Sequence, residues 1–210
     1  GRLVGRFTIK DAIDVFQEYY EAQVSHMGRV SDEDLFAPVI TSARRRAVWL
    51  GINLVTAFAA SVVIGVFDAV VAQVVALAVL MPIVASMGGI TGSQTLTLTI
   101  RGLATGQLAK SNLRALGNKE VLVAFFNGLL WAAVVAVITS FWFDNPWLSA
   151  IIGFSIVLNM LIAAFAGIAI PVFLDKIGID PALAGSVILT TVTDVVGFFV
   201  FLGSASLLLV

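Results

Sequence analysis

Five long apolar stretches, separated by short polar segments, dominate the order of residues along the chain. Each is about as long as the roughly 20 residues that a helix needs to cross a hydrocarbon core of roughly 30 Å. A proline and several glycines interrupt the second stretch, where we expect its helix to bend. Another proline is expected to end the fourth stretch. The predicted spans are residues 47–67, 70–101, 121–141, 148–170 and 182–210.

The segment before the first span has the pattern of an amphipathic, acidic helix. Thr8 and Asp11 predict a capped helix start, and the helix is expected to continue to about Met27. Acidic side chains recur every three or four residues and therefore share one face. That face is either simply solvated or needs divalent cations to neutralise it, since hard cations select carboxylate oxygen. The acidic residues are Asp11, Asp14, Glu18 and Glu21, and residues 31–34 are expected to form an exposed acidic loop.

Basic residues lie on only one side of the predicted spans. The turns expected at Asp68 and at residues 144–146 contain no Lys or Arg. Because an excess of Lys and Arg marks cytoplasmic loops, the basic side is expected to be cytoplasmic. The N-terminus would then be cytoplasmic and the C-terminus outside. The basic residues beyond the N-terminal segment are Arg44, Arg45, Arg46, Arg101, Lys110, Arg114, Lys119 and Lys176.

The composition narrows the class of protein further. With 60% hydrophobic residues, 12% charged residues and a mean hydropathy of +1.04, the chain differs from an ordinary soluble domain. It has no Cys and one His, so a metal would be bound through oxygen. A net charge of -1 argues against nucleic acid as a partner. We therefore predict an all-α polytopic membrane protein, with five transmembrane helices in the lipid bilayer and an amphipathic acidic cytoplasmic helix before them.

One acid, Asp194, lies at the middle of the last apolar stretch. A carboxylate at the centre of a membrane helix costs about 3 kcal/mol on insertion scales, so it usually has a function. Thr190, Thr191 and Ser186 fall on about the same helical face as Asp194. The alternative is an acid that is buried in its neutral form or bonded to a neighbouring helix for packing.

The second stretch combines Pro82 with Gly88, Gly89 and Gly92, followed by Ser93. Such residues could bring backbone carbonyls to a surface that faces water or an ion. The alternative is a helix-packing surface of small residues, because Gly88 and Gly92 have the Gly-x-x-x-Gly spacing. One span with one carboxylate cannot enclose an ion. Two copies in a symmetric dimer would place two acids and two glycine-rich segments around one axis.

Several motifs lie in or next to the second and fifth spans. They are Met81-Pro82, Gly88-Gly89-Ile90-Thr91-Gly92-Ser93-Gln94, Ile100-Arg101-Gly102-Leu103-Ala104, Asp180-Pro181-Ala182 and Thr190-Thr191-Val192-Thr193-Asp194-Val195-Val196-Gly197. Together these motifs resemble the MgtE family of magnesium channels and transporters. The resemblance covers all five spans and implies a homodimer whose pore is lined by the second and fifth spans. It also implies that Mg²⁺ is both the transported and the regulatory ion, and that the protein is not an enzyme.

The same resemblance assigns roles to individual residues and segments. Asp194 would be the principal pore carboxylate, and Asp180 would share regulatory Mg²⁺ with the acids of the N-terminal helix, which would plug the cytoplasmic pore mouth. Residues 1–7 would be the end of a CBS domain, residues 8–30 the plug helix and residues 31–210 the pore domain. The remaining pore groups would be the carbonyls around Gly88 and Gly89 and the side chains of Ser93, Ser186 and Thr190.

The chain departs from the family pattern at three positions. Ile90 stands where many members have Asn, and Ser93 and Ser186 replace larger amides. The expected function is Mg²⁺-selective transport into the cytoplasm across the bacterial inner membrane, gated by Mg²⁺ at the plug helix. The alternative is an ion-coupled secondary carrier of Mn²⁺, Co²⁺ or Ca²⁺. An intramembrane aspartyl protease is disfavoured, because Asp68 and Asp194 are expected to be the only acids in or near the spans and lie at different depths. A scaffold that transports nothing would tolerate loss of Asp194.

Overall fold

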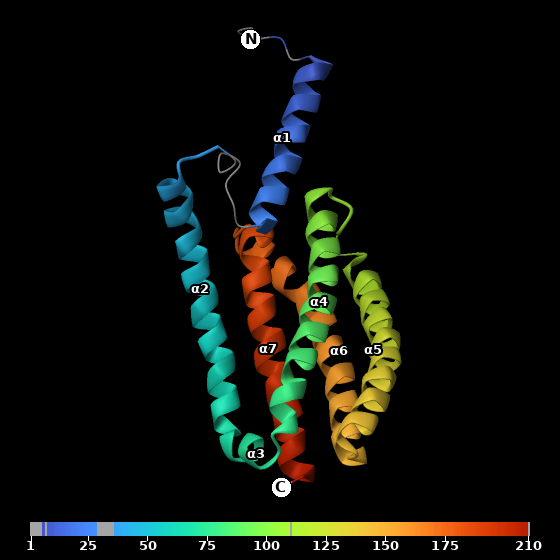
Figure 1. Ribbon diagram of the computed structural model, residues 1–210. Coiled ribbons are helices and arrows are strands. Elements are labelled where there is room, and N and C mark those ends of the chain that lie inside the picture. Colours follow the sequence, from blue (N-terminus) through green and yellow to red (C-terminus); the bar gives the residue numbers. More distant parts are fainter. Residues whose placement is uncertain (1–5, 7, 29–35, 110, 210) are drawn as a thin grey trace. The chain divides into compact units, whose positions relative to one another are not determined.

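The computed structural model describes residues 6, 8–28, 36–109 and 111–209 of the 210-residue chain. Across these residues the chain is helical and contains no strand. Five of the described helices are long and apolar enough to cross a membrane, which confirms the predicted fold class (Figure 1). The helices are α1 (Ile9–Gly28), α2 (Val39–Val66), α3 (Asp68–Gln73), α4 (Ala76–Ala104), α5 (Leu113–Phe143), α6 (Pro146–Lys176) and α7 (Pro181–Leu208).

The chain divides into two compact units, residues 1–52 and residues 53–210. In the first unit, the backbone amide and the hydroxyl of Thr8 each donate a hydrogen bond of 2.7 Å to Asp11 Oδ2. The amide of Asp11 donates back to Thr8 Oγ1 at 3.3 Å. These reciprocal bonds confirm the capped start of α1. The end of a CBS domain expected at residues 1–7 and the acidic loop expected at residues 31–34 lie outside the described residues, apart from Arg6, which is in neither helix nor strand.

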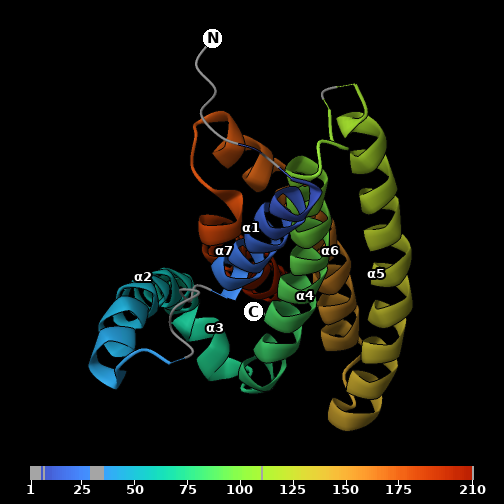
Figure 2. The same ribbon diagram turned by 90° about the horizontal axis from the view of Figure 1, so that it is seen from above.

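In the second unit, α6 packs extensively against α4, α5 and α7, whereas α4 and α5 contact each other only slightly. Figure 2 shows α6 beside α4 and α5 from above. Side chains of α6 such as Ile151, Ile152 and Ile156 are fully or almost fully buried, together with Leu80 of α4 and Phe201 of α7. The apolar core of this unit is therefore built around α6.

Neither of the two prolines expected to interrupt or end a span ends its helix. Pro82 lies inside α4 and Pro171 lies inside α6, and both helices continue past them. In lipid, a broken helix would leave several backbone groups without hydrogen bonds, whereas an internal proline removes only one donor. The interruption expected in residues 70–101 falls earlier, at Val74 and Val75, which separate α3 from α4.

The helices of the first, third and fourth spans are longer than expected. The helix α2 begins at Val39, so Arg44 to Arg46 lie inside it rather than before it. The expected connector over residues 102–120 is too long, because α4 ends at Ala104 and α5 already begins at Leu113. The segment between the fourth and fifth spans is correspondingly shorter than expected, since α6 continues to Lys176.

The turn expected at residues 144–146 is confirmed. Asp144 ends α5 in the left-handed conformation, with φ of 49°. The side-chain oxygen of Asn145 accepts hydrogen bonds from the amides of Trp147 and Leu148, at 3.0 and 3.2 Å, and Pro146 occupies the first turn of α6. This is the chemistry of a helix N-cap followed by proline. It holds α5 and α6 as antiparallel neighbours.

Candidate functional site

The helices α4 and α7 pack together at two glycine contacts. A Cβ atom added to Gly92 would lie 2.8 Å from Leu189 Cδ1, and one added to Gly185 would lie 3.1 Å from Leu96 Cδ1. From the first contact to the second, the residue in α4 moves one helical turn forward, from Gly92 to Leu96, and the residue in α7 moves one turn back, from Leu189 to Gly185. Glycine therefore lets α4 and α7 approach closely, and the contacts fix an antiparallel register between them.

This register shows which residues of α4 lie at the same height along the helix pair as Asp194 of α7. One turn from Leu189 toward the end of α7 lies Thr193, followed by Asp194, and one turn from Gly92 toward the start of α4 lie Gly88 and Gly89. The predicted pore acid and the glycine-rich segment are thus brought together at one level of the helix pair, although they are about 100 residues apart in the sequence.

The predicted pore groups other than Gly88 lie on faces that the helices of the unit leave at least partly uncovered. On α4, Ser93 is exposed, and a Cβ added to Gly89 would meet nothing within 4 Å. Both residues line an open groove of about 730 Å³. On α7, Thr190 is exposed, while Ser186 and Asp194 are partly buried. Within the described residues, these groups therefore border a surface rather than a closed cavity.

The threonines around Asp194 use their hydroxyl hydrogens inside α7. Thr190 Oγ1 donates to the carbonyl of Ser186 and Thr191 Oγ1 to that of Val187, both at 2.8 Å, and Thr193 Oγ1 donates to the carbonyl of Thr190 at 3.1 Å. A hydroxyl bonded in this way still has oxygen lone pairs to offer. Exposed Thr190 is therefore oriented as an acceptor, which suits the water shell of a cation.

Gly88 differs from Gly89, because it is buried and faces the interior of the unit. A Cβ on Gly88 would overlap Nδ2 of Asn159 and lie 2.8 Å from its Cγ. A Cβ on Gly197 would lie 2.6 Å from the same Nδ2. Gly88 and Gly92 therefore pack against neighbouring helices on the side where a Cβ would lie, as the helix-packing alternative predicted. A pore role for the Gly88 carbonyl stays a prediction.

Asn159 of α6 is a residue that the sequence analysis missed. It is fully buried, and its Nδ2 donates to the carbonyl of Val84 at 3.0 Å. Its Oδ1 has no hydrogen-bond partner among the described residues. Because its amide also fills the spaces beside Gly88 and Gly197, Asn159 joins α4, α6 and α7 close to the level of Asp194. An amide within a long apolar span, where polar groups often bond across helices, was the available signal.

Glu120 is a second missed residue, and the expectation that Asp68 and Asp194 are the only acids in or near the spans is wrong. Glu120 lies inside α5 and is 6% exposed. Its Oε1 lies 3.4 Å from Lys119 Nζ, and its Oε2 accepts a long bond of 3.4 Å from Thr95 Oγ1 of α4. It borders a cavity of about 190 Å³ between α4 and α5, whose other polar lining residues are Thr91, Gln94, Thr95 and Asn127.

The predicted regulatory acids of α1 are placed on an open helix. Asp14 and Glu18 are exposed, whereas Glu21 Oε1 accepts a bond of 2.8 Å from Gln17 Nε2. The Thr8 hydroxyl, followed by the Thr8 amide, lowers the pKa of Asp11 below its ordinary value. In the part of the chain that the structure describes, no three acidic or His side chains group to hold a metal ion.

The last predicted regulatory ligand, Asp180, is the N-cap of α7. Its Oδ1 accepts a hydrogen bond of 2.8 Å from the amide of Ala182, and Pro181 occupies the first turn. Asp180 belongs to the second unit and α1 to the first. Their sharing of a metal ion therefore stays a prediction.

These features define a polytopic helical membrane protein in which an acid of one span lies level with the glycine-rich segment of another. The chain belongs to the MgtE family: the family profile, described as a divalent cation transporter, matches residues 81–204. The matched region contains the glycine-rich part of α4 and the acid of α7.

Curated relatives are similar along almost the whole chain. Magnesium transporter MgtE of Bacillus subtilis is 31% identical over 205 residues, 97% of this chain and 46% of the relative. Magnesium transporter MgtE of Thermus thermophilus is 34% identical over 212 residues, 100% of this chain and 47% of the relative. The protein of the same name from Enterococcus faecalis is 27% identical, covering 98% and 45%. The chain thus spans about half the length of these relatives.

Proposed function

We propose that the chain is the membrane part of a Mg²⁺ transporter, in which two copies line a pore with α4 and α7. The observation that carries the proposal is Asp194, which lies level with Gly88 and Gly89 on a partly uncovered face. The family is one of divalent cation transporters, and the similar curated proteins are named magnesium transporters. Family membership thus supports the transported ion, and the geometry supports Asp194 as the residue that binds it.

Magnesium suits this arrangement because it gives up its water reluctantly. It usually keeps several waters and is bound through one or two carboxylates. Two Asp194 side chains related by a two-fold axis would supply the charge. The hydroxyls of Thr190 and Ser93 and the carbonyls near Gly89 would accept hydrogen bonds from the water shell. No dehydrating cage is needed, so the small set of polar groups is sufficient.

A homodimer is supported by how little of α2 is covered. Ala60 is the one buried residue of this helix, and large apolar side chains such as Leu54, Phe58 and Val62 are exposed. Lipid can cover part of such a surface, and a second copy would cover the rest. The distribution of the basic residues supports an N-terminus on the cytoplasmic side of a bacterial inner membrane. The membrane potential would then drive Mg²⁺ inward by about 2.3 kcal/mol per charge for each 100 mV.

Gating would come from the acidic face of α1. Without Mg²⁺, the carboxylates of this face would repel one another and Asp180, and bound Mg²⁺ would hold α1 in place as a plug. These carboxylates belong to Asp11, Asp14, Glu18 and Glu21. Asp11 and Glu21 each have one oxygen engaged in a local hydrogen bond. These two acids would therefore contribute their other oxygen, or bind through a water of the ion.

The buried Glu120 favours one alternative, an ion-coupled carrier of a divalent metal such as Mn²⁺, Co²⁺ or Ca²⁺. An ionisable group inside a membrane protein often relays protons or binds a coupling ion. The small side chains of Ser93 and Ser186 and the apolar Ile90 also leave the metal preference open. A carrier predicts saturable uptake that depends on a proton or sodium gradient, and loss of that dependence in Glu120→Gln.

Metal uptake into liposomes tests the proposal. Purified wild type, Asp194→Asn and Asp194→Ala are compared, with Ca²⁺ and Mn²⁺ as competitors. Asp68→Asn is the matched control, because Asp68 is exposed and bonds only locally to the amide of Ala69 at 2.6 Å. We expect both Asp194 variants to lose Mg²⁺ uptake and the control to keep it. Unchanged uptake in Asp194→Ala would show that the pore lies elsewhere.

A further inference from the structure

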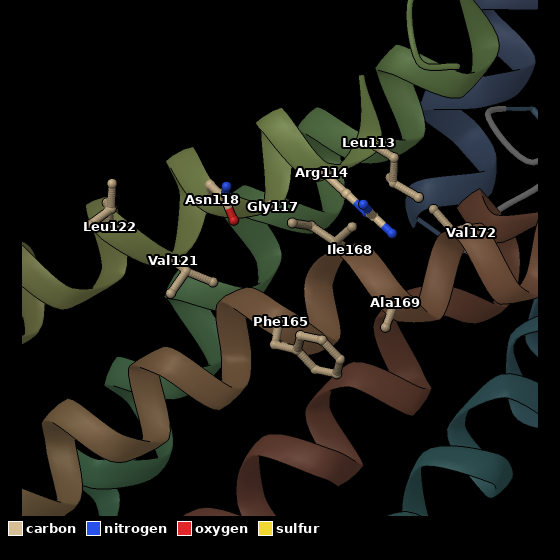
Figure 3. A pocket seen from close by; sticks show the side chains of 10 residues that line it. All are labelled: Leu113, Arg114, Gly117, Asn118, Val121, Leu122, Phe165, Ile168, Ala169 and Val172. Atoms are coloured by element: carbon tan, nitrogen blue, oxygen red, sulfur yellow. The ribbon is translucent and has the colours of Figure 1, made fainter. Parts of the chain in front are cut away.

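A groove of about 660 Å³ lies between α5 and α6, on the side of the second unit away from α7 (Figure 3). It extends from the start of α5 to Leu122, along the last third of α6. The part of α6 that lines the groove, from Phe165 to Val172, is about 12 Å long, which is a large part of the thickness of one membrane leaflet. Its lining is apolar apart from Arg114, near the end where α5 begins, and Asn118, about one turn further along α5. The apolar side chains include Val121, Leu122, Phe165 and Ile168.

The polar end of the groove carries an unbalanced positive charge. Arg114 lies in the first turn of α5, where the aligned backbone dipoles already produce a positive potential. That turn contains no acid, and neither does the lining of the groove. Within the described parts of the chain, Arg114 has no recorded ion pair. Figure 3 shows its guanidinium directed over the groove, beside Ile168. An anion is the complement of this end.

We propose that the α5–α6 groove binds an anionic phospholipid, with its phosphate at Arg114 and one acyl chain along the apolar wall. The charge lies at the end of the spans where the basic residues gather, so the lipid would belong to that leaflet. In the orientation proposed above it is the cytoplasmic leaflet. Basic pockets between membrane helices on this side suit acidic headgroups. The inference depends on membrane insertion and not on Mg²⁺ transport.

A second copy of the chain fits the groove less well than a lipid. A two-fold interface is self-complementary, so it would bring two copies of Arg114 toward each other. No acid in the lining would compensate the repulsion between them. A zwitterionic lipid would satisfy the apolar wall but would leave the charge of Arg114 and the helix terminus without a net counter-charge.

Two variants test the binding of the headgroup and the binding of the acyl chain separately. Arg114→Gln removes the charge and keeps the groove. Gly117→Leu fills the groove and keeps the charge, and it is sterically tolerable because a Cβ on Gly117 would meet only Ile168 Cδ1, at 3.9 Å. Arg101→Gln is the matched control, since Arg101 is an exposed arginine in the last turn of α4 and is not part of the groove.

The test is native mass spectrometry of each purified protein in detergent, with phosphatidylglycerol or phosphatidylcholine added. We expect wild type and Arg101→Gln to retain phosphatidylglycerol preferentially. Arg114→Gln should bind it about fivefold more weakly, as expected for one basic residue near a membrane surface. Gly117→Leu should weaken both lipids.

Three results would overturn the proposal: equal retention of both lipids by wild type, an equal loss in Arg101→Gln, or unchanged binding in Arg114→Gln. Loss of a dimer in Gly117→Leu, without loss of lipid, would identify a second copy as the occupant instead. Thermal unfolding of each variant shows whether it is folded. If Gly117→Leu does not fold, Arg114→Gln and its control still decide the question.

Discussion

Replacing Gly88 by Ala should destabilise the second unit through Asn159. The new methyl group would overlap Nδ2 and lie 2.8 Å from Cγ of Asn159. The amide has little room to withdraw, because it also fills the space beside Gly197 and bonds to the Val84 carbonyl. Overpacking costs about 1–3 kcal/mol and loss of one buried hydrogen bond about 1 kcal/mol. We therefore expect the free energy of unfolding to fall by about 2–4 kcal/mol.

The neighbouring glycine provides the control for this prediction. A Cβ on Gly89 would meet nothing within 4 Å, and alanine is the better helix former by about 1 kcal/mol, so Gly89→Ala should be neutral or stabilising. Reversible unfolding in detergent, followed for both variants under the same conditions, measures the difference. Equal stability of Gly88→Ala and Gly89→Ala would refute the packing argument.

A double-mutant cycle identifies the partner of Gly88. In an Asn159→Ala background the amide is absent, so the cost of adding Gly88→Ala should fall below about 1 kcal/mol. Residues in contact give such non-additive effects, whereas separate residues give costs that sum. Additive costs would therefore mean that the methyl group does not meet Asn159.

Three further changes test other parts of the structure. Asn145→Ala removes the N-cap of α6 and should lower the free energy of unfolding by about 1 kcal/mol in the same unfolding assay. Because the pKa of Asp11 is lowered, its carboxylate stabilises the start of α1 at pH values above the ordinary carboxyl pKa, and this stabilisation is lost as pH falls through the lowered value. In an NMR titration, Thr8→Ala should move this pKa up toward the ordinary value. No movement would count against the capping bonds. Glu120→Gln keeps an acceptor for the Thr95 hydroxyl and should unfold at a higher temperature than Glu120→Ala, which removes that acceptor; the reverse order would show that the bond contributes nothing.

The elements that the sequence predicted correctly depend on local chemistry. The five spans follow from the length of apolar stretches, and the start of α1 from the spacing of Thr8 and Asp11. The turn before α6 follows from Asn145 and Pro146, which cap and begin a helix in any context. Asp194 could be singled out because an acid at the middle of an apolar stretch is costly wherever its helix packs.

The features that the sequence did not predict depend on the membrane or on contacts between distant residues. The spans extend past Pro82 and Pro171 because lipid penalises a broken helix more than one missing hydrogen bond. Glu120 was assigned to a connector because the apolar stretch after it begins at residue 121, and only the contact with α4 shows that it is buried. Asn159 bonds to a carbonyl 75 residues away, which no local pattern reveals.

The contacts of Asn159 also limit how this sequence can diverge over evolutionary time. A Cβ at Gly88 or Gly197 would come too close to the amide of an asparagine at position 159, so a larger residue at either position requires that amide to move. A relative with a smaller residue at position 159 should be free to carry alanine at either glycine, and a relative that keeps the amide should keep both glycines. These three positions should therefore vary together, whereas Gly89, one residue away, should vary independently of position 159.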